Sequence, residues 1–140
     1  MKKIENYCSC LSVLEKGNFQ QAQDDEIYRM GMIGQFQLTF ELAWKALKAV
    51  LELDGVQSSD TGSPRDVLKT AASVGFLKDD EVWLLMLKKR NLSTHIYDEE
   101  EADELMILLR DSFIPAFRTL RDFLMQKQAE IEADDKEEAH

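Results

Sequence analysis

The sequence is poor in cysteine, histidine and proline, with two of each among its 140 residues. Cys8 and Cys10 stand two positions apart, so on a helix they point to different faces and cannot easily form a disulfide. A metal site needs more ligands than these thiols, one internal histidine and scattered carboxylates supply at workable spacing. We therefore expect free, buried or half-buried thiols, no metal ion and no cofactor.

Long apolar runs are also missing. No stretch approaches the ~18 to 20 apolar residues that a membrane-spanning helix needs. The first ten residues, MKKIENYCSC, contain two lysines but no uninterrupted apolar stretch of the kind that marks a secretory signal. We expect a cytoplasmic protein that makes no contact with a membrane.

Basic residues are outnumbered, with 17 Lys and Arg against 27 Asp and Glu and a net charge of −10. Residues 126 to 140 carry six acids and two lysines, and the rest of the chain remains acidic without them. Contacts to phosphates dominate nucleic-acid binding, so a protein this acidic is a poor candidate for gripping DNA or RNA over a broad surface. We expect no DNA binding, and chemistry on RNA would require a locally positive pocket.

What the chain does contain is helical periodicity. Apolar residues recur at helical spacing in five segments, and sustained strand-like alternation occurs nowhere in the sequence. The segments are residues 4–15, 24–53, 64–74, the 80s beginning at Asp79 or Asp80, and Glu99 to about Gln126. The pattern predicts an all-α protein, an antiparallel up-and-down bundle of four to five helices. We expect one domain over residues 1–127 and an acidic, flexible tail over residues 128–140.

Several residues mark expected helix ends. Asp24 and Asp25 suit a helix start, and Ser63 followed by Pro64 is typical of an N-cap and a first helical position. Gly75 is a good C-terminal stop for the helix that begins there.

Other residues predict features inside helices. Pro115 removes one backbone hydrogen bond, so we expect a kink in the fifth helix. Gly31 and Gly34 lower helix propensity by about 1 kcal/mol each relative to alanine, and we expect them to allow a kink or the close approach of another backbone. Trp44 and Trp83 fall on apolar stripes and are expected in the core.

One stretch, KKRNLSTHIYDEEE at residues 88–101, gathers residues suited to chemistry on phosphates. Arg90 carries a planar, permanently charged fork that matches phosphate. His95 exchanges protons near neutral pH, and Asn91 can orient a ligand oxygen or an imidazole. This trio needs no metal to cleave RNA: histidine would take the proton of a ribose 2′-hydroxyl while arginine stabilises charge on the phosphate.

The spacing leaves two interpretations open. On one continuous helix, five residues turn by about 500°, so Arg90 and His95 would point about 140° apart. They converge only if the helix ends or bends near Ser93 and Thr94, or if two subunits contribute. Otherwise the stretch is an ordinary helix end with solvated charges, and its acids from Asp98 to Glu101 favour a helix start.

The stretch also resembles a known family. Its R-N-x-x-x-H pattern is similar to the Arg-polar-x3-His signature of HEPN domains, and R-x4-H-x-Y resembles the motif of HepT toxins. The blocks FQLTFELAWKALKAVLE (36–52), SPRDVLKTAASVGFL (63–77) and VWLLMLKKRNLSTHIYDEE (82–100) together resemble the nucleotidyltransferase substrate-binding proteins. Gln35 and Gln37 stand where that family leads us to expect charged residues, and they are candidates for the cleft or the partner surface.

The resemblance implies a HEPN-like bundle that forms a homodimer, with both motifs facing one cleft. It assigns Arg90 and His95 as the catalytic pair of a metal-independent endoribonuclease and Asn91 as their support. It further implies a toxin–antitoxin pair, in which a minimal nucleotidyltransferase silences the toxin by transferring AMP to Tyr97. The alternative is a non-catalytic subunit that presents substrate or nucleotide to that nucleotidyltransferase.

Overall fold

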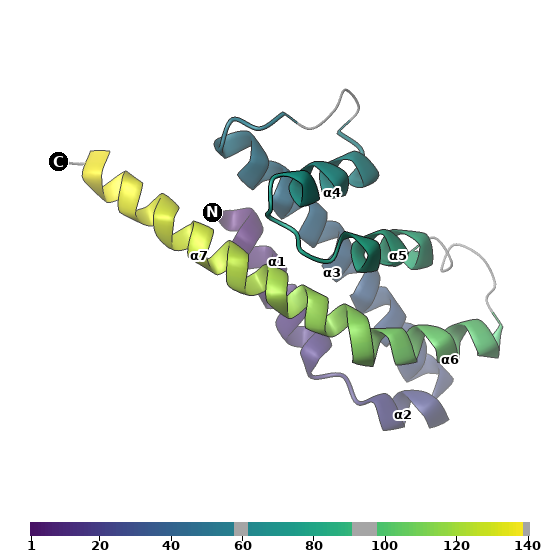
Figure 1. Ribbon diagram of the computed structural model, residues 1–140. Helices are drawn as coiled ribbons and strands as arrows, with labels where there is room; N and C mark the ends of the chain where they lie inside the picture. Colours follow the sequence, from purple (N-terminus) through teal and green to yellow (C-terminus); the bar gives the residue numbers. More distant parts are fainter. Residues whose placement is uncertain (58–61, 91–97, 139–140) are drawn as a thin grey trace.

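The computed structural model describes residues 1–57, 62–90 and 98–138, and within these ranges the chain is helical, without strands. In chain order (Figure 1) the elements are α1 (Lys2–Glu15), α2 (Phe19–Asp24), α3 (Glu26–Leu53), α4 (Pro64–Ser73), α5 (Asp80–Arg90), α6 (Glu99–Leu108), the π-helical turn η2 (Leu109–Phe113) and α7 (Ile114–Glu138). The predicted all-α class is confirmed. No helix of the described ranges is both long enough and apolar enough to cross a membrane.

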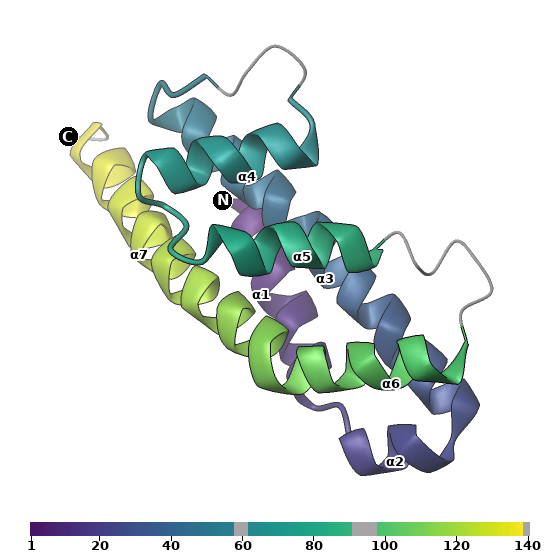
Figure 2. The same ribbon diagram turned by 45° about the vertical axis from the view of Figure 1, so that its right-hand side comes forward.

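Helix α1 packs against α3 and α7 and runs antiparallel to both (Figures 1 and 2). Two contacts fix its register on α7. The Met1 amine donates to Gln128 at 2.5 Å, and the Tyr7 hydroxyl donates to the carbonyl of Phe117 at 2.6 Å. Helices α4 and α5 pack on α3 and on each other, so α3 contacts five other helices, which are α1, α2, α4, α5 and α7.

An aromatic cluster fills the centre of the bundle. Phe36 stacks on Phe113 with ring centroids 5.3 Å apart, and Trp83 meets Phe117 edge-on at 5.4 Å. Trp83 is buried, as predicted, whereas Trp44 is only half-buried at the edge of the core. Aromatic pairs of this geometry stabilise a core beyond the area they bury.

The predicted helix starts follow from their caps. The Asp25 side chain accepts a hydrogen bond from the N–H of Tyr28 and caps α3. The Ser63 hydroxyl accepts from the N–H of Asp66 at 3.2 Å, and Pro64 follows it as the first residue of α4. Gly75 adopts a φ of +85° just after α4, a conformation that favours glycine.

Helix α2 is a short element that the periodicity does not predict. The Asn18 side chain accepts from the N–H of Gln21 at 3.0 Å and so begins it, and Asp24 ends it. Its six residues are too few to show a repeat, and Ala22 is its one buried residue. Only the asparagine cap signals this helix in the sequence.

The predicted fifth helix is divided by η2. The N–H of Ile114 donates to the carbonyl of Leu109, five residues earlier, which is the bond of a π-helix. This wider turn lies directly before Pro115, whose ring would otherwise meet the carbonyl four residues back. The predicted kink is present, and Figure 2 shows the change of direction between α6 and α7.

Helix α7 is longer than the sequence predicts. The apolar pattern predicts an end near Gln126, whereas the helix continues to Glu138, with residues 132–138 exposed. The division into a domain over 1–127 and a flexible tail over 128–140 stays a prediction. Cys8 and Cys10 are free thiols, half-buried and buried respectively, as expected.

Candidate functional site

The predicted arginine lies where the last turn of α5 meets the middle of α3. Arg90 is the final residue of α5, and its Nη1 donates to Oε1 of Glu41. Its guanidinium carbon also lies 5.5 Å from the ring centroid of Phe40. Phe40 and Glu41 are adjacent on α3, so a ring face and a carboxylate hold the same guanidinium.

Two more side chains of α3 complete this contact region. Nε1 of Trp44 donates to Oε2 of Glu41 at 3.0 Å, and Nε2 of Gln37 donates to the backbone carbonyl of Arg90 at 3.3 Å. Positions 37, 40, 41 and 44 recur at the spacing that places helical residues on one face. We call these four residues, Gln37, Phe40, Glu41 and Trp44, the α3 platform.

The platform is partly shielded from solvent. The Arg90 side chain is 25% exposed and that of Glu41 is 34% exposed. At such a position an ion pair is screened less than on an open surface, while the guanidinium stays within reach of solutes. The arrangement can therefore offer an oriented cation to an anionic ligand.

A second ion pair joins the end of α5 to the middle of α6. Lys89 Nζ lies 3.0 Å from Oε1 of Glu104, and the lysine side chain is 14% exposed. Asp98 caps α6 by accepting from the N–H of Glu101 at 2.8 Å, as the acidic run predicts. Lys88, Lys89 and Arg90 occupy the last turn of α5, where cations favour the helix dipole.

Of the four predicted site residues, the structure places Arg90. Asn91, His95 and Tyr97 lie outside the described residues, so the convergence of Arg90 and His95 stays a prediction. The described ranges contain no cluster of three or more His, Cys, Asp or Glu side chains arranged to hold a metal ion.

Sequence reasoning missed Phe40 and Glu41 and assigned Trp44 to the core alone. The sequence offers no local signal for Glu41, because it lies beside the apolar stripes of α3 and its role depends on a contact with α5. Of the two glutamines, Gln37 donates to the backbone carbonyl of Arg90, and its place in a cleft or partner surface stays a prediction. Gln35 instead donates to the carbonyl of Cys10 at 3.0 Å, between α3 and α1.

Comparisons with known proteins agree with this fold. The family described as "Nucleotidyltransferase substrate binding protein like" matches residues 2–126. A relative from Haemophilus influenzae named "Probable ribonuclease HepT" is 28% identical over 100 residues, which span 70% of this chain and 68% of that protein.

Two solved structures are similar along most of their length. A Thermus thermophilus protein aligns with a TM-score of 0.65 and 28% identity, covering 86% of this chain and 97% of that one. A Haemophilus influenzae protein, described as having the fold of a substrate binding domain of a nucleotidyltransferase, aligns with a TM-score of 0.73 and 23% identity, covering 87% and 98%.

Proposed function

Since the chain belongs to the nucleotidyltransferase substrate-binding-protein-like family, we propose that it is a HepT-like, metal-independent endoribonuclease whose site contains Arg90 and His95. The observation that carries the proposal is the guanidinium of Arg90, held between Phe40 and Glu41. This oriented cation directly precedes Asn91 and His95 in the sequence. A relative named as a probable ribonuclease supports the same reaction class.

The proposed reaction requires no metal. His95 takes the proton of a ribose 2′-hydroxyl, the 2′-oxygen attacks the adjacent phosphorus, and the bond to the 5′-oxygen breaks. The leaving oxygen takes up a proton, and the products are a 2′,3′-cyclic phosphate and a 5′-hydroxyl. Arg90 stabilises the negative charge that develops on the phosphate oxygens, and Asn91 supports the pair.

The reaction is tested by incubating purified protein with RNA in EDTA. We expect cleavage that leaves 2′,3′-cyclic phosphate ends, lost in Arg90→Ala and in His95→Ala. Activity that persists in both variants would show that the catalytic assignment is wrong.

A homodimer would bring two motifs into one cleft, and an exposed apolar face of α3 supports it. Ile27, Met30 and Leu38 are 84%, 53% and 51% exposed. On the same helix, a Cβ added at Gly31 or Gly34 would meet nothing within 4 Å, so the backbone there is bare. Large exposed apolar side chains beside bare backbone suit close packing of a second helix.

This face is tested by sedimentation of Leu38→Glu. We expect a dimer for the wild type and a monomer for the variant, because a buried unpaired carboxylate is costly. Met125→Glu, at a residue 55% exposed on α7, is the matched control and should stay dimeric. A dimeric Leu38→Glu protein would exclude this face as the interface.

The proposed partner is a minimal nucleotidyltransferase acting as antitoxin. The Tyr97 hydroxyl would attack the α-phosphate of ATP bound to that partner, forming tyrosyl-AMP and releasing pyrophosphate. The added group is bulky and negatively charged, so it would block the cleft and repel RNA phosphates. Co-expression with the partner should add the mass of AMP, and Tyr97→Phe should prevent the addition.

The alternative is a non-catalytic subunit that presents substrate to the nucleotidyltransferase. One observation favours it: the Glu41 carboxylate contacts Arg90 Nη1, a position that a phosphate oxygen would have to share. Binding of RNA or nucleotide without cleavage, in a protein that still associates with the partner, would support this reading. A nucleotidyltransferase encoded by the neighbouring reading frame is expected under both functions.

A further inference from the structure

We propose that Glu41 is a positioning residue that holds the Arg90 guanidinium in the orientation needed to meet an RNA phosphate. The inference rests on the proposed ribonuclease function. It assigns a role to a carboxylate on a different helix from the catalytic motif, far from it in sequence.

Holding an arginine side chain in one orientation costs conformational entropy. Its long side chain has many rotamers, so a guanidinium at a helix end samples many directions unless other groups hold it. The α3 platform restrains Arg90 from several sides. Phe40 lies against the guanidinium, Glu41 binds Nη1, and Gln37 binds the backbone carbonyl.

Glu41 is itself held in place by a second side chain of α3. Its Oε2 accepts the indole N–H of Trp44 at 3.0 Å, so both carboxylate oxygens are engaged, one on each side. Both residues belong to the 28-residue helix α3, whose core face is packed against the other helices. Groups supported in this way on a rigid helix keep their geometry better than groups on a loop.

The planar shape of the guanidinium makes its orientation matter. It presents five N–H groups in a planar fork, and a carboxylate bound at Nη1 together with a ring against the face fixes the orientation of that plane. Fixing the plane directs the fork before substrate arrives, and preorganised charge is worth most in the transition state. Glu41 therefore acts through Arg90 and does not need to touch RNA.

A competing role would be inhibition, in which Glu41 occupies the arginine and excludes phosphate. The two roles predict opposite outcomes. Removing the charge of a positioning residue lowers kcat, because the arginine loses its orientation. Removing the charge of an inhibitory residue raises the rate and tightens binding of RNA.

The decisive experiment is side-chain NMR of the full-length protein with Glu41→Gln, a variant of nearly equal volume. The chain has two tryptophans, so two indole N–H resonances are expected. We expect the Trp44 resonance to shift in the variant and that of Trp83 to stay. The Arg90 Nε–H resonance, identified by its loss in Arg90→Lys, should show an order parameter of about 0.8 in the wild type and below about 0.6 in Glu41→Gln.

The same variant is then tested for RNA cleavage in EDTA. We expect kcat to fall by about 100-fold with KM nearly unchanged, because misplacing a catalytic group slows the chemical step. Trp44→Phe, which removes only the N–H that holds Glu41, should give a smaller fall in kcat. Glu15→Gln removes an arginine-bound carboxylate on α1 and should change neither kcat nor the Arg90 resonance.

The outcomes separate this inference from the proposed function. An unchanged Arg90 order parameter in Glu41→Gln overturns the positioning role whether or not the wild type cleaves RNA. A faster Glu41→Gln enzyme, or one with unchanged kcat beside an inactive Arg90→Ala, also overturns it. Suppose that the wild-type protein cleaves no RNA and that the Arg90 order parameter still falls in Glu41→Gln. This result overturns the ribonuclease function and supports the positioning role.

Discussion

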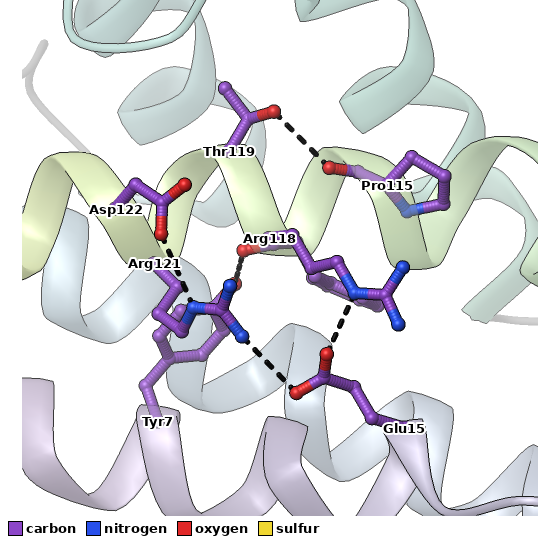
Figure 3. Close-up of polar contacts among 8 residues, drawn as sticks. Tyr7, Glu15, Pro115, Arg118, Thr119, Arg121 and Asp122 are labelled. Atoms are coloured by element: carbon purple, nitrogen blue, oxygen red, sulfur yellow. Dashed lines mark hydrogen bonds and ion pairs between the residues drawn. The ribbon is translucent and has the colours of Figure 1, made fainter.

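Among the residues that the structure describes, two carboxylates bind arginines of another helix, in different surroundings. Glu15 on α1 binds two arginines of α7, with Oε2 2.7 Å from Nε of Arg118 and Oε1 3.2 Å from Nη1 of Arg121 (Figure 3). Glu41 on α3 binds Arg90 at the end of α5, and its other oxygen is held by Trp44.

The groups around each carboxylate indicate that the two carboxylate–arginine contacts have different roles. Around Glu15 the contacts join the first helix to the last, beside the buried Tyr7 hydroxyl that bonds α7 (Figure 3). Around Glu41, the Phe40 ring and the Gln37 amide contact Arg90. The Trp44 indole contacts the Glu41 carboxylate. We infer that the Glu15 cluster fastens two helices and that the Glu41 cluster orients one cation.

The largest expected effect is the loss of RNA cleavage in Arg90→Ala, compared with Arg118→Ala in the other cluster. Arg90→Ala should lower kcat/KM for RNA cleavage by about 100- to 1000-fold, the usual cost of losing one donor that stabilises developing charge. Arg118→Ala, at a side chain 49% exposed, should leave the rate within about twofold, since it removes only a surface ion pair. Initial rates on one RNA substrate measure both variants. Equal losses in the two would abolish the distinction between the clusters.

The next effect concerns the hydroxyl that lies beside the Glu15 cluster. Tyr7→Phe removes the buried bond to the Phe117 carbonyl and should lower the free energy of unfolding by about 1 to 2 kcal/mol, measured by urea titration. RNA cleavage should be unaffected. A variant as stable as the wild type would show that this bond does not fasten α1 to α7.

The same residue predicts a pH dependence. Burial raises the pKa of Tyr7 well above its ordinary value. Above pH 10, roughly the ordinary tyrosine pKa, the unfolded chain loses this proton while the folded chain retains it, so stability falls as pH rises toward the folded pKa. Tyr7→Phe should remove this part of the alkaline loss. Urea titrations between pH 9 and pH 11, on the order of the tyrosine range, compare the two proteins.

The smallest expected effect is that of Glu15→Gln on stability. The Glu15 side chain is 24% exposed and its partners are partly exposed, so we expect a loss below about 1 kcal/mol. The loss should shrink as salt is raised, because added ions screen the pairs. A loss well above this value, or one insensitive to salt, would mean that the cluster does more than fasten the surface of two helices.

Much of the fold can be predicted from local sequence patterns, namely helix-capping residues and the spacing of apolar residues. Asp25, Ser63 and Gly75 mark helix ends through short-range bonds and backbone preferences, which a sequence displays directly. Helix α2 was missed because six residues show no repeat, and the full length of α7 was missed because residues 132–138 are exposed and carry no apolar stripe.

The candidate site also contains residues that local sequence patterns predict and residues that they do not. Arg90 could be found from its motif, because residues close in sequence form the pattern. Glu41 and Phe40 could not, since their role depends on how α5 lies across α3, which no local pattern encodes. The half-buried position of Trp44 has the same origin.

The π turn before Pro115 also determines how the preceding helix, α6, is rotated about its axis relative to α7. An α-helix advances by about 100° per residue, so deleting one residue from Leu109–Phe113 would rotate α6 by roughly that angle about its axis. Ala102 and Leu105 would leave the core, and Asp98 would point in a new direction. A single residue of helical register near the proline thus sets which residues of α6 face the core.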